Sequence, residues 1–379
     1  MNSECTENAQ NAQNPIATHS PLCVQPDESA RKKCRPYKEV EIPSDMFRRM
    51  SLFFLIMLAG CQLPFSSPTS SNVHLVIDAG SSGTRFCPYE VDNQCRHLDV
   101  SQDCLSIKSS GGLADLPEPE ILRIMKDGFQ NLQGMNIEKV VVLGTGGFRR
   151  LPATKQAQQM ELVRSAVTAQ FAQSEARILT GEEEAQLAYI AMVAYRDGKR
   201  DHVILETGGA TVQIAGQDLS PMSIPAGLNA MRNLSGPPAA CRENTKPSRD
   251  RFHNCADGLR KVFRSQSWYA SFFQNRTLSN VYALGSSWKS IFTVAKATKI
   301  DQKELELQGI RICSSSQQKI VEAGVPEKFA SASCYLHAYQ FVLISELNLQ
   351  ELHAGEGSWP PGAAISNLFA GCPAGLPGN

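Results

Sequence analysis

Two glycine-rich segments, each preceded by a short apolar run, constrain the fold of this chain more than any other feature. The first is Asp78–Arg85 (DAGSSGTR), and the second is Glu206–Gln213 (ETGGATVQ). In each segment an apolar run ends in an acid and a turn of Gly, Ser and Thr. Backbone amides and hydroxyls of such a turn can bind phosphate oxygens while the acid holds a divalent cation. Two copies roughly 130 residues apart predict two similar lobes that face each other across a phosphate chain.

The length and composition are compatible with two globular lobes. The chain has 379 residues, of which 42% are hydrophobic and 20% charged, so it can bury a sizeable core. Its formal net charge is zero and it has no long basic run. The composition therefore gives no support to nucleic-acid binding.

The segment before the first lobe reads as an export signal. Residues 1–45 are polar and without periodicity, which is typical of a disordered stretch or of a mis-assigned upstream start. Two arginines, Arg48 and Arg49, then precede the apolar run 51–58, which is too short to span a bilayer comfortably. The run ends in Leu-Ala-Gly-Cys61, which resembles the lipobox of bacterial lipoproteins, in which the cysteine is lipidated.

This pattern predicts an exported lipoprotein of the cell envelope, on the periplasmic side or the surface of a bacterium. Lipidated Cys61 would attach it to the membrane, and the Ser- and Thr-rich stretch that follows would be a flexible tether. The alternative is a type II membrane anchor, or a buried helix with an incidental cysteine.

The cysteine count agrees with export. Of 12 cysteines, an even number follows the signal, which favours disulfides: Cys87, Cys95, Cys104, Cys241, Cys255, Cys313, Cys334 and Cys372. We expect the pairs Cys241–Cys255 and Cys313–Cys334, whereas the connectivity of the other four is not readable. Scattered reduced thiols are the alternative. The cysteines and the seven histidines show no metal-ligand spacing, and the histidines are expected on the surface or in loops.

The hydrophobic pattern predicts alternating strands and helices in both halves. In the first half we expect strands at 73–78, 85–91, 139–143 and 176–179, and helices at 119–132, 155–171 and 182–195. The polar stretch 196–201 should link the lobes. In the second half a hairpin surrounds the second loop, residues 234–258 read as an irregular insertion, and the strand 281–285 enters a helix at Ser286.

A cluster of three glutamates lies between the two loops. Thr180 and Glu183 form a capping-box pattern, so simple helix initiation explains Glu183. It does not require Glu184, which could accept a proton from a water that attacks a bound phosphate. Asp78 and Glu206 are placed to hold Mg²⁺ or Ca²⁺. Thr211 and Gln213 lie two residues apart, on the same face of a strand, and could orient the water.

The motifs together resemble the apyrases, or nucleoside triphosphate diphosphohydrolases, of the actin-like ATPase superfamily. The resemblance extends from about residue 73 to 365, with five or six motifs in family order. Asp78–Arg85, Gly144–Arg149, Ile178–Glu184 and Leu205–Gln213 are similar to the first four apyrase regions. Two later segments, 226–232 and 358–362, are similar to further family elements. Cys313 and Cys334 stand where the family has a disulfide.

The resemblance implies an α/β fold of two actin-like (ribonuclease H-like) lobes with the active site in the interlobe cleft. The expected organisation is an N-terminal stretch with a signal at 1–61, a tether at 62–72, lobe I at 73–199, lobe II at 200–350, and a segment at 351–379 that returns to lobe I. Glu184 maps to the family's base, and Thr211 and Gln213 to its water-orienting positions. The expected phosphate or nucleotide contacts are Ser81, Ser82, Gly83, Thr84, Arg85, Thr145, Gly146, Arg149, Gly208, Gly209, Ala210 and Trp288.

Some residues depart from the apyrase pattern. Glu206 replaces an aspartate and Thr211 a serine, and no tyrosine precedes Cys334, where the family often stacks the nucleobase. The resemblance implies hydrolysis of terminal phosphates of nucleoside tri- and diphosphates. One alternative is an exopolyphosphatase or guanosine pentaphosphate phosphohydrolase, which the segment 181–189 resembles equally well. The other is a non-catalytic nucleotide-binding lipoprotein. The sequence leaves base specificity and oligomeric state open.

Overall fold

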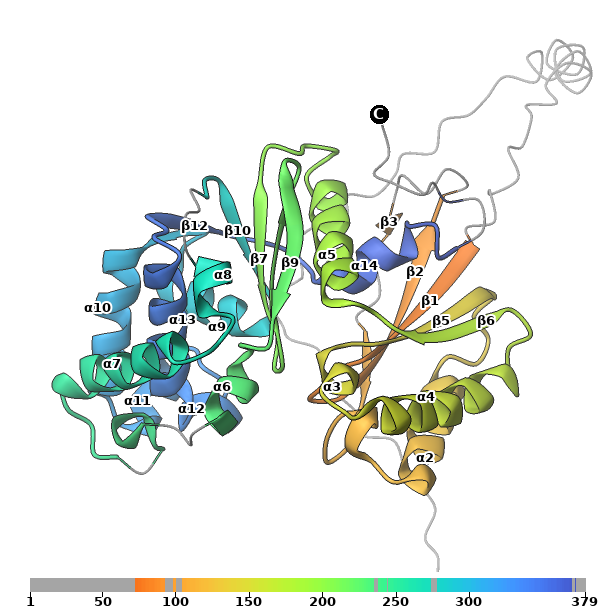
Figure 1. Cartoon of the computed structure of the whole chain (residues 1–379), viewed down its shortest axis with the longest axis horizontal. Helices are drawn as coiled ribbons and strands as arrows, with labels where there is room; N and C mark the ends of the chain where they lie inside the picture. Colours follow the sequence, from red (N-terminus) through yellow and green to blue (C-terminus); the bar gives the residue numbers. More distant parts are fainter. Residues whose placement is uncertain are drawn as a thin grey trace, which may run out of the picture. The chain divides into compact units, whose positions relative to one another are not determined.

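The described part of the chain is built around two mixed β-sheets. The computed structural model describes residues 72–92, 98–99, 104–234, 238–243, 245–273, 278–369 and 372, all within one compact unit, Pro68–Asn379. The sheet strand orders are β3-β2-β1-β5-β6, with β4 also paired to β2, and β11-β12-β10-β7-β8-β9. The expected pair of α/β lobes is therefore present (Figure 1).

The first sheet forms around β1 (Asn72–Ala79), whose side chains at 75–77 are completely buried. Apolar, β-branched residues favour such a central strand. β1 pairs antiparallel with β2 and parallel with β5, which in turn pairs parallel with β6. The other elements of this lobe are β2 (Thr84–Val91), β3 (Leu98–Asp99), β4 (Leu105–Ile107), β5 (Ile137–Gly144), β6 (Ser174–Ile178), the 3₁₀ turn η3 (Leu113–Asp115), α2 (Glu118–Asn131), α3 (Gly146–Arg149) and α4 (Ala153–Thr168).

The second sheet repeats this path. β7 (Val203–Thr207) pairs antiparallel with β8 (Val212–Gly216) and parallel with β10 (Val281–Leu284), which pairs parallel with β12 (Glu351–Ala354). β9 (Leu219–Ile224) and β11 (Lys299–Asp301) complete the sheet. The helices of this lobe are α6 (Leu228–Leu234), η4 (Ala239–Cys241), α7 (Asp250–Arg264), α8 (Tyr269–Phe273), α9 (Ser286–Ala295), α10 (Gln302–Cys313), α11 (Gln317–Glu322), α12 (Glu327–Ala330) and α13 (Ser333–Glu346).

Two helices pack between the sheets. α5 (Gly181–Tyr195) begins with a complete capping box from Thr180 and Glu183, as the sequence predicts. α14 (Trp359–Ala364) lies beside it, and both share one apolar cluster with residues of β1, β2, β7 and β8 (Figure 1). A Cβ on Gly362 would lie 1.9 Å from the carbonyl oxygen of Leu187, so glycine is required at this contact. The C-terminal segment thus packs on α5 and the first sheet.

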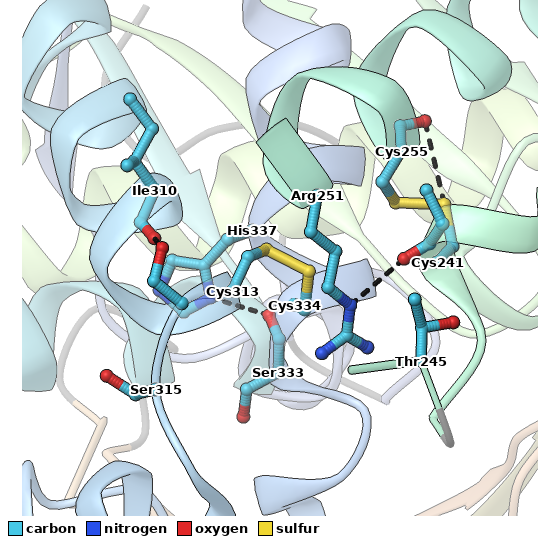
Figure 2. Close-up of a disulfide and its surroundings, with 12 residues drawn as sticks. Cys241, Thr245, Arg251, Cys255, Ile310, Cys313, Ser315, Ser333, Cys334 and His337 are labelled. Atoms are coloured by element: carbon cyan, nitrogen blue, oxygen red, sulfur yellow. Dashed lines mark hydrogen bonds between the residues drawn. A yellow bond between two sulfur atoms is a disulfide. The ribbon is translucent and has the colours of Figure 1, made fainter. Parts of the chain in front are cut away.

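Two expected disulfides are confirmed, and a third is added. Cys241–Cys255 and Cys313–Cys334 are bonded, and Figure 2 shows both bridges with His337 beside the second. Cys87 is bonded to Cys104, a pair that the sequence left open. Cys372 is also disulfide-bonded.

The structure corrects two predictions about the second lobe and the histidines. The stretch expected to be irregular contains η4 and the first half of α7, because Phe252, Cys255 and Leu259 at helical spacing bury one face of α7. His74, His202 and His337 are buried rather than on the surface. Each ring fills a packed position and stays neutral, because burial lowers its pKa.

The predicted signal, lipidated Cys61, the tether up to residue 71, and Cys95 lie outside the described residues. Within the described ranges, no helix is both long and apolar enough to cross a membrane.

Candidate functional site

The two glycine-rich segments form matching hairpin loops. In the first, the amide of Gly80 donates to the carbonyl of Gly83 (3.1 Å), and in the second, Gly208 donates to Thr211 (3.0 Å). The strand register places Asp78 opposite Arg85 and Glu206 opposite Gln213. The same tight turn therefore follows an acid at the same position of each hairpin.

The two loops approach each other closely because glycine occupies the contact positions. A Cβ on Gly209 would lie 2.9 Å from Ser81 Oγ. A Cβ on Gly146, just after β5, would lie 2.9 Å from Thr211 Cγ2, and one on Gly227 would lie 2.4 Å from the carbonyl carbon of Ala210. Because glycine has no Cβ, three backbone segments can converge at these points.

A cleft of about 1860 Å³ opens over the converging loops. Most of the predicted site residues line it: Asp78, Ser81, Ser82, Gly83, Thr84, Arg85, Thr145, Gly146, Glu184, Glu206, Gly208, Gly209, Ala210, Thr211 and Gln213. They come from both sheets and from the first turn of α5. The structure thus brings together residues that are far apart in the sequence.

Glu184 lines this cleft and is only 6% exposed. Its Oε2 accepts a hydrogen bond from Arg149 Nη2 at 2.7 Å, and the same guanidinium donates to the carbonyl of Leu179 (3.1 Å). Burial raises the pKa of Glu184 to about 7, although Arg149 acts in the opposite direction. A carboxylate with such a pKa is suited to exchange a proton near neutral pH.

Thr211 and Gln213 lie next to this carboxylate. Gln213 Nε2 donates to Thr211 Oγ1 at 2.7 Å, and Arg149 Nη2 lies 3.5 Å from the same hydroxyl. Gln213 also hydrogen-bonds Glu184. The threonine hydroxyl is thus held in a fixed direction, which is what orienting a water requires.

Asp78 and Glu206 each keep one carboxylate oxygen without a partner. Arg85 Nε donates to Asp78 Oδ2 at 2.9 Å, and Ser358 Oγ donates to Glu206 Oε1. Among the described residues, Asp78 Oδ1 and Glu206 Oε2 are buried without any hydrogen bond. Burial and the nearby carboxylate of Glu184 raise the pKa of Glu206 to about 8. Unpartnered acidic oxygens at the base of a cleft fit a divalent cation, because such a cation would satisfy both.

The acidic groups do not form a closed protein cage for a metal. Within the described residues, no group of three or more His, Cys, Asp or Glu side chains is placed to hold one ion. Mg²⁺ is often bound by one or two carboxylates together with waters and substrate phosphates. Two carboxylates with open oxygens match that mode.

The structure places two predicted contacts elsewhere. Trp288 is fully buried in the core of the second lobe, and its Nε1 donates to Thr207 Oγ1 at 3.0 Å. It cannot stack on a base, so that prediction is wrong. Arg149 contacts Glu184 and Thr211 and does not line the cleft.

Sequence reasoning did not single out several residues that line the cleft, Phe329 and Ser358 among them. Phe329 on α12 lines it with 51% of its surface exposed, whereas large apolar side chains of the described residues are mostly buried. Ser358, at the start of α14, contacts Glu206 directly. The sequence held a signal for Ser358: Pro360 and Pro361 have no backbone N–H, so this serine cannot cap the helix that follows it.

The fold is similar to solved structures of a Ppx/GppA phosphatase and of an exopolyphosphatase. A type II variant of the Aquifex aeolicus Ppx/GppA phosphatase is 12% identical, with a TM-score of 0.56 over 79% of this chain and 100% of that chain. An exopolyphosphatase from Cytophaga hutchinsonii is 15% identical, with a TM-score of 0.53 over 77% and 96%. No protein-family model and no curated protein matches the chain. At identities this low, the structural similarity establishes only the fold, which is the predicted pair of actin-like lobes.

Proposed function

We propose that this protein is a metal-dependent phosphoanhydride hydrolase that removes terminal phosphates from nucleoside tri- and diphosphates. One observation carries the proposal. The buried carboxylate of Glu184, with its pKa raised to about 7, lies beside Thr211 and Gln213 between two glycine loops that each follow an acid. A base, a water-orienting pair, phosphate donors and cation-binding oxygens are the parts that phosphoryl transfer to water requires.

The chain's residues would act as follows. Thr211 and Gln213 orient a water, and Glu184 accepts its proton as the water oxygen bonds to the terminal phosphorus. The bond from that phosphorus to the bridging oxygen breaks, which releases inorganic phosphate and leaves the nucleotide shorter by one phosphate. The backbone amides and hydroxyls of the loops 80–85 and 208–211 bind the phosphate oxygens on both sides. Asp78 and Glu206 would hold Mg²⁺ or Ca²⁺, which when bound offsets the negative charge of the phosphates.

Phe329 supports a nucleotide as substrate. It lines the cleft with about half of its surface exposed, and stacking on an aromatic side chain binds a base without strong base selectivity. Inorganic polyphosphate offers nothing to stack. A nucleoside di- or triphosphate would use both the aromatic side chain and the glycine loops.

Exopolyphosphatase activity is the second candidate. The similar solved structures are described as Ppx/GppA phosphatases and exopolyphosphatases, and their fold is the one found here. Lys108 and Lys289 also line the cleft and could bind a longer phosphate chain.

Phosphate release decides between these candidates. The purified full chain is assayed with ATP, ADP and polyphosphate, each with Mg²⁺ or Ca²⁺ and then with excess EDTA. If phosphate is released from both ATP and ADP, and excess EDTA abolishes this release, the proposal is supported. Turnover of polyphosphate alone would favour the exopolyphosphatase. Nucleotide binding without any turnover would favour the non-catalytic lipoprotein.

Export remains part of the proposal. The signal pattern and Cys61 lie outside the described residues, and the disulfides of the described part are consistent with an oxidising compartment. Incorporation of labelled palmitate in a bacterial host, lost in Cys61→Ala, would test lipidation.

A further inference from the structure

The hydroxyl of Ser358 makes an unusual contact for a residue at the start of a helix. Its Oγ donates to Oε1 of Glu206, a residue on a strand of the second lobe 152 positions earlier. Glu206 is 5% exposed, and its other oxygen, Oε2, is buried without a partner. The contact therefore fixes one oxygen of the carboxylate and leaves the other open.

Ser358 has no capping role that would explain it. A serine at the N-cap normally accepts a hydrogen bond from the backbone N–H of the second or third helical residue. In α14 those residues are Pro360 and Pro361, which have no N–H. The side chain of Ser358 accordingly makes no capping bond, and its hydroxyl is directed to Glu206.

The segment that carries Ser358 is itself held at both ends. The amide of Gly355 donates to the carbonyl of Ala283 on β10 at 3.0 Å. Gly357 has a φ of 75°, and a Cβ there would lie 2.7 Å from the ring of Tyr195, so this residue must be glycine. Trp359 is 2% exposed in the cluster around α5. These contacts give the serine hydroxyl a defined position.

The two hairpins show why Glu206 needs this partner. In the first hairpin Arg85 lies opposite Asp78 and holds its carboxylate. In the second, Gln213 lies opposite Glu206, but its Nε2 is committed to Thr211. Glu206 also has one more methylene than an aspartate, and hence one more rotatable bond to restrain. The hydrogen bond that restrains the Glu206 carboxylate comes instead from Ser358, outside this hairpin.

We propose that Ser358 is a positioning residue that holds the Glu206 carboxylate so that Oε2 faces the cation. The inference rests on the metal role of Glu206 in the proposed function. Groups that orient a metal ligand typically change metal affinity by about 10- to 100-fold when they are removed. The C-terminal segment thereby takes part in building the cation site.

The test is a titration of the full chain with Mn²⁺, followed by the electron paramagnetic resonance signal of the free ion, without nucleotide. Ser358→Ala is expected to weaken Mn²⁺ binding about tenfold or more, and Ser358→Thr, which keeps the hydroxyl, about threefold or less. The Mg²⁺ concentration for half-maximal hydrolysis should rise in parallel, while kcat at saturating Mg²⁺ falls less.

Ser366→Ala is the matched control, because Ser366 is a buried serine of the same segment whose hydroxyl donates to the carbonyl of Ala363. It should leave Mn²⁺ affinity unchanged, and a cooperative thermal unfolding transition measured without metal checks that each variant is folded. Ser358→Ala with wild-type affinity would overturn the inference, provided that Glu206→Gln binds more weakly. A wild-type chain that binds no Mn²⁺ overturns the inference together with the metal role. Mn²⁺ binding that depends on Ser358 in a chain that hydrolyses no phosphoanhydride upholds the inference and refutes the proposed function.

Discussion

Replacing Glu184 by glutamine should inactivate the protein and at the same time stabilise it above neutral pH. Glutamine has the shape of the carboxyl group but carries no charge and cannot accept the proton. Loss of a general base typically costs about 100- to 10,000-fold in rate. Destabilised variants also lose activity, so the gain in stability separates a catalytic role from structural damage.

The size of the gain follows from the buried position of Glu184. Burial raises its pKa from 4.5 to about 7, and at about 1.4 kcal/mol per pKa unit this corresponds to about 3 kcal/mol. Between these values the folded protein binds more protons than the unfolded chain, so stability falls as the pH rises through this range. The glutamine variant lacks this term. It should be about 3 kcal/mol more stable than the wild type at pH 8, and within about 1 kcal/mol of it at pH 5.

Urea unfolding at pH 5 and pH 8 measures both differences. Glu183→Gln is the matched control, because Glu183 is the neighbouring acid of the same helix turn, with a capping role and a salt bridge to Arg177. Burial acts to raise the pKa of Glu183, but hydrogen bonds from Arg177 and Thr180 outweigh it and lower this pKa, so the variant should keep its activity and gain no stability at pH 8. The reasoning is refuted if Glu184→Gln is no more stable than the wild type at pH 8, since Arg149 would then fully compensate the buried charge.

The wild-type pH profile should agree: kcat/KM is expected to rise with pH and level off above about pH 8, since Glu184 must be unprotonated to act; a flat profile from pH 5 to 8 would speak against it. Phe329→Ala should raise the KM for nucleotides about tenfold and leave that for polyphosphate unchanged, because stacking is worth about 1–3 kcal/mol; an equal change for both would remove Phe329 from base binding. Gly227→Ala should cost about 1–3 kcal/mol of stability and reduce kcat, because its Cβ would lie 2.4 Å from the Ala210 carbonyl carbon. Gly111→Ala, with nothing within 4 Å, is its control in both assays. Cys313→Ser should lower the unfolding free energy by about 2–5 kcal/mol while activity at 25 °C persists, as thermal unfolding and phosphate release would show.

Local patterns were enough to predict the parts of the fold that position the site. The hairpins around the two loops follow from an apolar strand, a glycine turn and a second strand, all within about 20 residues. β10 and the start of α9 were predicted at their observed positions for the same reason. The capping box fixed the start of α5 and, with it, the place of Glu184. Each of these signals is contained in neighbouring residues.

Residues whose role depends on distant partners were not predictable in the same way. An indole such as that of Trp288 can stack on a ligand in a cleft or pack in a core. In the second lobe it packs in the core and donates to Thr207. The buried histidines show the same limitation. His74 stacks on Phe369 at 4.0 Å between ring centres, almost 300 residues along the chain. The sequence shows that Ser358 precedes two prolines and so cannot cap its helix. It does not show that the hydroxyl of Ser358 contacts Glu206, 152 positions earlier.

The two hairpins have the same strand register and turn, but they carry different residues opposite the acid, and these residues have different roles in the site. In the first, the position opposite the acid is Arg85, a cation that can hold Asp78 or meet a phosphate oxygen. In the second, the same position is Gln213, a neutral amide that bonds Thr211 and Glu184. A second arginine there would pair with the carboxylate of Glu184 or Glu206 and hold it ionised. Because Gln213 is neutral, burial can keep the pKa of Glu184 near 7, and the water-activating half of the site depends on this asymmetry.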